Sequence, residues 1–73
     1  MAQQNEHIKK LLVARDNEVV HRREVAAALA AQHQRGHEED MRVAIVSIQN
    51  AIEAIDRAIA DEKLISSDTL RGI

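Results

Sequence analysis

The chain has 73 residues, with ten Lys and Arg against twelve Asp and Glu and a formal net charge of −2. Cys, Pro, Phe, Tyr and Trp are absent, which excludes disulfides and thiolate metal sites and disfavours an all-β sandwich or barrel. Apolar residues make up 45% of the chain and charged residues 30%, which is typical of amphipathic helices. So short a chain is marginally stable as a monomer, and oligomerisation is the usual remedy where disulfides and metals are missing.

The charge is spread unevenly. Residues 1–37 carry six positive and four negative side chains, whereas residues 38–73 carry four positive and eight negative ones. Oppositely charged halves suit a chain that folds back on itself or pairs with a copy. The missing basic excess argues against duplex nucleic acid as a partner. Neither a long apolar stretch nor a signal peptide is found, so we expect no membrane partner and a cytoplasmic location.

The first predicted helix spans about residues 4–34. Its apolar residues fit one face at 3.6-residue periodicity: Ile8, Leu11, Leu12, Val19, Ala26, Leu29, Ala30 and His33. Arg15, Arg22 and Arg23 lie on or near that face, where their long stems can cover apolar surface while the charge stays in water.

The second predicted helix spans about residues 38–64 and has the clearer pattern. An uninterrupted heptad seam, spaced 4, 3, 4, 3, 4, runs along it: Met41, Ile45, Ile48, Ile52, Ile55 and Ile59. One edge of the seam is widened by Ala44, Ala51 and Ala58. Acidic residues at 38–40 complement the positive N-terminus of a helix.

The two helices are expected to form one domain over residues 1–73, an antiparallel hairpin with a turn at about residues 35–37. Gly36 is suited to the left-handed cap that ends the first helix, and so short a connection makes the helices antiparallel neighbours. After the second helix, residues 66–68 offer capping side chains before a short C-terminal tail. Apolar residues also lie off the seam: Val13, Val20, Val43, Val46 and Ala60. The fold class is therefore all-α, with hairpins assembling into a homo-oligomeric helical bundle.

Catalytic and metal chemistry find little support. His33 and His37 have the spacing of two metal ligands on a helix, but Gly36 interrupts it and we interpret both as solvated. The carboxylates of the second helix lack a cleft that would shift their pKa values, and neither a nucleophile elbow nor a phosphate-binding glycine loop is present. We expect no enzyme activity, no metal and no cofactor.

The basic side chains of the first predicted helix have two possible roles. Lys9, Lys10, Arg15, Arg22 and Arg23 could grip an anionic ligand, Arg bidentately and Lys as a point charge. Spacing alone favours the alternative, in which they pair with acidic residues of the second helix.

Residues 48–60 read IQNAIEAIDRAIA. They resemble the second hairpin helix of the phage-encoded anti-CBASS and anti-Thoeris sponges, which reads like LQQGFMAIxRAIA. The identical positions are Gln49, Ala54, Ile55, Arg57, Ala58, Ile59 and Ala60. Residues 5–11 are similar to the NExIK start of the first helix in some members, whereas the glycine-phenylalanine pair of the family is here Ala51-Ile52.

The resemblance implies a non-enzymatic phage protein in the host cytoplasm. Such a sponge sequesters cyclic di- or trinucleotide immune signals between protomers and thereby blocks antiphage defence. Val43, Asn50 and Arg57 are seven apart and face away from the isoleucine seam, which is suited to a protomer junction. The expected ligand-binding residues are Arg57, Arg42 and Asn50, with Lys9, Lys10 and Arg22 of a neighbouring first helix. The alternative is a structural or regulatory hairpin that acts through homo-oligomerisation or a protein partner and binds no small molecule.

Overall fold

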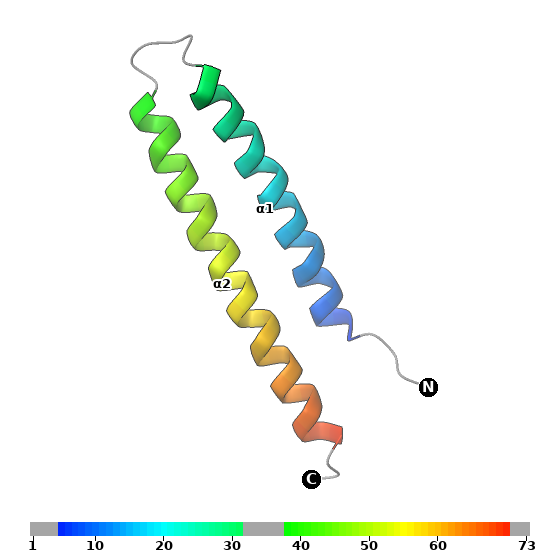
Figure 1. Cartoon of the computed structure of the whole chain (residues 1–73). Coiled ribbons are helices and arrows are strands. Elements are labelled where there is room, and N and C mark those ends of the chain that lie inside the picture. The colour runs from blue at the N-terminus through cyan, green and yellow to red at the C-terminus, as the bar shows by residue number, and fades with distance from the viewer. Residues whose placement is uncertain (1–4, 32–37, 71–73) are drawn as a thin grey trace.

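The computed structural model describes residues 5–31 and 38–70, with the side chains of residues 68–70 left aside. Two helices make up this part of the chain, α1 (Glu6–Ala31) and α2 (Glu38–Leu70). They pack side by side along their length as a hairpin, with no strand in the ranges given (Figure 1). The prediction of an all-α two-helix hairpin is confirmed. The expected turn around Gly36 and the expected last turn of the first helix lie outside the described residues.

Asn5 starts α1 and also ties it to the far end of α2. The Asn5 side-chain oxygen accepts hydrogen bonds from the backbone N–H groups of His7, at 2.7 Å, and Ile8, at 3.4 Å. This is the N-cap arrangement, which satisfies backbone donors that have no partner within the helix. The Asn5 amide nitrogen donates to the Ser66 hydroxyl at 2.6 Å.

α2 starts at Glu38, with acidic residues in its first turn, and runs to Leu70, six residues beyond the predicted end at about 64. Ser66 and Ser67 are half-buried within the helix and do not cap it. A serine favours either a cap or a local hydrogen bond, and here the Ser66 hydroxyl accepts its hydrogen bond from Asn5 of α1. At Ser66 the helix therefore still has a neighbour, Asn5, two residues beyond the predicted end.

The isoleucine seam of α2 forms the core. Ile48, Ile52 and Ile59 are buried, with Ile52 only 1% exposed. The remaining seam residues and the alanines beside them are half-buried: Met41, Ala44, Ile45, Ala51, Ile55 and Ala58. No member of the predicted seam is exposed, which confirms the heptad reading. Three buried side chains among the described residues are nevertheless a small core for a chain of this length.

The face that α1 turns to α2 matches the predicted one only in part, since Ile8, Leu11, Val19 and Leu29 are half-buried as expected. Leu12 is 40% exposed, and Arg23, Ala26 and Ala30 are exposed as well. Most of the half-buried positions of α1 repeat at intervals of 3 and 4, with Ala14 and Val19 half-buried beside them: Ile8, Leu11, Arg15, Glu18, Arg22, Val25 and Leu29. The middle of this face is charged, and the stems of its arginines can cover the isoleucines of α2.

A hairpin only one pair of helices thick leaves much surface in contact with water. Its Cα atoms extend over 58 × 19 × 12 Å, and its solvent-accessible surface is 5802 Å². A compact monomer of the same mass exposes about 4,500 Å². Large apolar side chains contribute to the surplus: Leu12, Val13, Val20, Val43, Val46, Leu64 and Ile65 are exposed. Neither described helix combines the length and apolarity that a membrane crossing requires.

Candidate functional site

Three hydrogen-bonded pairs of side chains show how the two helices of the hairpin lie against each other. The pairs are Asn5 with Ser66, Arg15 with Asp56 and Arg22 with Gln49, and in each pair the residue numbers sum to 71. A constant sum is the mark of antiparallel helices in a single register. The start of α1 therefore lies beside the end of α2, and the end of α1 beside the start of α2 (Figure 1).

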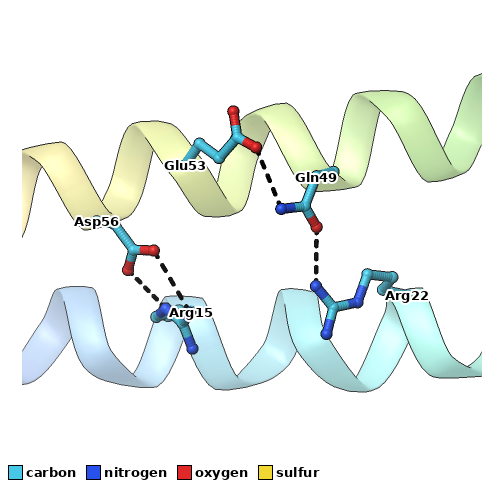
Figure 2. Close-up of polar contacts among 5 residues, drawn as sticks. All are labelled: Arg15, Arg22, Gln49, Glu53 and Asp56. Carbon is cyan, nitrogen blue, oxygen red and sulfur yellow. Dashed lines mark hydrogen bonds and ion pairs between the residues drawn. The ribbon is translucent and has the colours of Figure 1, made fainter.

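Arg15 and Asp56 form a two-pronged ion pair across the hairpin. Arg15 donates from Nε to Oδ1 of Asp56 at 2.6 Å and from Nη2 to Oδ2 at 3.4 Å (Figure 2). The hydrogen bond and the charge of Asp56 raise the pKa of Arg15 above its ordinary value. A raised pKa of a basic group adds stability that is fully present below its unfolded pKa and is lost only as pH rises through the folded value. Arg15 therefore stays charged at neutral pH.

We expect Arg15→Ala to change the melting temperature little. Both side chains of the pair keep over a third of their surface in water, where solvent screens the attraction and ordering the side chains costs entropy. The measurement is thermal unfolding followed by circular dichroism, with Asp56→Asn as the matched variant on the other helix. A loss of stability as large as that of a buried isoleucine would contradict this expectation.

A second polar contact leads from the hairpin interior to its outer surface. Arg22 is half-buried and donates from Nη1 to the side-chain oxygen of Gln49 at 2.8 Å. The Gln49 amide nitrogen in turn donates to Oε2 of Glu53 at 3.2 Å, one turn further along α2 (Figure 2). The bonded chain fixes the orientation of the Gln49 amide and holds the exposed Glu53 carboxylate in place. Arg22 is thus engaged within its own hairpin.

The outer face of α2 carries a shallow groove of about 390 Å³ near the start of the helix. It is lined by Glu39, Arg42, Val43, Val46, Ser47 and Asn50. All six belong to one helix, so the groove lies between neighbouring ridges of side chains and has no opposite wall. Arg42 makes an ion pair with Glu39 at 3.7 Å, and both side chains are largely exposed. A small molecule here would keep much of its surface in water unless a second element covered it.

The structure brings only some of the predicted ligand-binding residues together. Arg42 and Asn50 line the same groove, and the exposed Arg57 lies two turns beyond Asn50 on the same helix. Lys9 and Lys10 are exposed near the start of α1, which the antiparallel register places at the opposite end of the hairpin from Arg42. Six such residues could act on one ligand only if different protomers supplied them.

Sequence reasoning missed two contributors to this surface and one to the interface. Glu39 and Ser47 line the groove, and Gln49 is the acceptor of Arg22. The signal for Gln49 was present, since it directly follows the seam residue Ile48 and lies seven residues before Asp56. Such positions flank a heptad seam and contact the neighbouring helix.

Among residues 5–31 and 38–67, no three His, Asp or Glu side chains gather as a metal site would require. The predicted histidine pair at 33 and 37 lies outside this part of the chain. Comparison with protein-family models, with curated proteins and with solved structures gives no match. The resemblance to the nucleotide sponges therefore rests on residues 48–60 and 5–11 alone.

Proposed function

We propose that this protein is a non-enzymatic interaction module whose hairpins associate through their outer faces, with copies of itself as the first partner. The observation that carries the proposal is the apolar surface that the hairpin leaves uncovered. Val43, Val46 and Leu64 of α2 are each more than half exposed, as are Val13 and Val20 of α1. Monomeric proteins expose single apolar side chains, but repeated ones along both helices mark an interaction surface.

The exposed area supports the same conclusion. The chain exposes 5802 Å², about 1,300 Å² more than a compact monomer of its mass. A stable protein interface buries roughly 800 Å² on each partner. The surplus is thus sufficient for one standard interface. Because only three of the described side chains are buried within the hairpin, association would supply core that the single chain lacks.

Sedimentation equilibrium should give a mass of at least twice the 8.2 kDa of the chain at micromolar concentration. The melting temperature should also rise with protein concentration, because association stabilises the folded state by mass action. A protein that sediments as a monomer and melts independently of concentration would contradict self-association.

Sequestration of a cyclic nucleotide in the cytoplasm is the second candidate. One feature favours it beyond the resemblance of residues 48–60: Arg42 and Asn50, two of the residues expected to bind the ligand, line one groove. A guanidinium grips phosphate and an amide can hydrogen-bond a base. The groove is open, so a second hairpin would have to close it over the ligand.

The test is to add a panel of cyclic di- and trinucleotides and to measure the heat of binding. Bound ligand should leave solution and return unaltered when the protein is denatured by heat. Arg57→Ala and Arg42→Ala should each weaken binding about ten- to a hundredfold because a phosphate contact is lost. Lys63→Ala serves as the control, since it removes an exposed positive charge of α2 that is not among the expected ligand-binding residues. Cleaved nucleotide would indicate an enzyme, and ligand that never leaves solution would exclude sequestration.

A further inference from the structure

We infer that two copies of this chain pair through the outer face of α2, with their α2 helices antiparallel. This inference rests on the proposed self-association and names the surface responsible for it. The surface, here called the outer stripe, consists of Val43, Val46, Asn50, Glu53, Arg57, Ala60 and Leu64. Every one of these residues is exposed. They follow one another at intervals of 3, 4, 3, 4, 3 and 4, which is the spacing of a coiled-coil seam.

The charges of the outer stripe determine the orientation of the second copy. Glu53 and Arg57 are its only charged members and occupy neighbouring turns. A parallel pairing in register would set Glu53 against Glu53 and Arg57 against Arg57. In an antiparallel pairing with Glu53 facing Arg57, the two-fold axis generates two attractive pairs. Complementarity of the stripe with itself therefore selects a second copy as its occupant.

The apolar members fit the same register. When Glu53 faces Arg57, the numbers of facing residues sum to 110, so Val46 faces Leu64 and Asn50 faces Ala60 of the second copy. Leu64 is 66% exposed and Val46 59% exposed in the single hairpin. Their contact would remove apolar surface from water on both sides of the charged centre. A polar residue such as Asn50 at a seam position is a known means of fixing register.

The charged groups of the stripe are available for such pairing. Arg57 makes no ion pair or hydrogen bond with any other described side chain, including Glu53 one turn before it. Glu53 is positioned by Gln49, which bonds Oε2 and leaves Oε1 without a partner among the described residues (Figure 2). Arg22 of α1 holds Gln49 in turn. The hairpin thus presents a fixed carboxylate on its outer surface.

α2 is favoured over α1 for this role because of its shape. The outer stripe contains the groove of about 390 Å³ beside Val43, Val46 and Asn50, and side chains of a facing helix pack into such grooves. α1 also exposes Val13 and Val20. Its oppositely charged pair on that side, Asp16 and Arg23, provides a matched control.

Charge reversal tests the pairing. Glu53→Arg or Arg57→Glu alone should weaken self-association about ten- to a hundredfold, since each places four like charges at the centre of the interface. The effect should diminish at high salt. Mixing the two variants should restore association, because the copies then complement each other. Reversing Asp16 or Arg23 in the same way should leave association unchanged.

Cysteine cross-linking tests the register independently, since the natural chain has no cysteine. Val46→Cys mixed with Leu64→Cys should form a disulfide-linked pair under mild oxidation, whereas neither variant should link to itself. In an antiparallel pair, two copies of residue 46 lie about 27 Å apart, far beyond the roughly 7 Å that a disulfide spans between Cα atoms.

The possible failures can be told apart. Wild-type protein that remains monomeric would overturn both the proposed self-association and this interface. Wild-type protein that associates but is insensitive to charge reversal at residues 53 and 57 would overturn the outer-stripe interface alone. Sensitivity at residues 16 and 23 instead would assign the interface to α1, and self-linking of Val46→Cys would indicate parallel helices.

Discussion

Ile52→Asp should unfold the hairpin. Ile52 is 1% exposed at the centre of the isoleucine seam, and Arg22 and Arg15, the cations of α1 that contact α2, are already bonded to Gln49 and Asp56. An unpaired carboxylate in such a place costs several kcal/mol. A domain of this length has a free energy of unfolding of only about 4–11 kcal/mol. We expect the far-ultraviolet circular dichroism signal of the helices to be lost at room temperature.

Three related variants separate the causes. Asn has nearly the same shape as Asp but carries no charge. The difference in the free energy of unfolding between Ile52→Asn and Ile52→Asp therefore measures the cost of the buried ion. Ile52→Ala should lower the free energy of unfolding by about 2–5 kcal/mol through the cavity it leaves. Ile65→Ala makes the same change at a side chain that is 50% exposed and should cost under about 0.5 kcal/mol. Equal effects at both isoleucines would contradict the assignment of the core.

Glu18→Leu should stabilise the protein. Glu18 is half-buried in the middle of the α1 face that covers the isoleucines, and it makes no ion pair or hydrogen bond with another described side chain. A leucine there would bury apolar surface in place of a partly desolvated charge, with a gain of about 1–2 kcal/mol. For a chain of this size the melting temperature should rise by roughly 4–16 °C.

The matched control is Glu24→Leu, the same change on the exposed side of α1. It should leave the melting temperature nearly unchanged, because the new leucine stays in water. Both variants should be melted at one protein concentration, since association shifts stability by mass action. If Glu24→Leu stabilised as much as Glu18→Leu, helix propensity would explain the gain and burial would not.

The roles of the candidate site residues could be predicted from the sequence only in part. Arg42 and Asn50 were expected to bind a ligand, Asn50 on the outer face of the second helix, and both line the groove there. Arg22 was expected at a ligand, yet it is half-buried and bonded to Gln49. Nothing local to Arg22 distinguishes these roles, because a basic side chain on a helix serves either a ligand or a neighbouring helix. Whether Arg22 binds a ligand or the neighbouring helix depends on which side chain of α2 lies opposite it, and here that side chain is Gln49.

The sequence alone determined the helical class, the hairpin and the buried face of α2. Isoleucines at heptad spacing all lie on one face of a helix, so they are buried only when that face packs against a neighbour, and Ile48, Ile52 and Ile59 are buried in this way. The sequence determined the inward face of α1 only in part, and it did not determine the end of α2. In α1 only part of the expected apolar face is half-buried, and the rest of the inward face is set by the isoleucines of α2 and by the bonds of Arg15 and Arg22. At the end of α2, Ser66 continues the helix where it contacts Asn5 of α1. Where the apolar periodicity of a helix is strong, its own sequence determines which face is buried. Where the periodicity is weak, the helix it packs against determines that face.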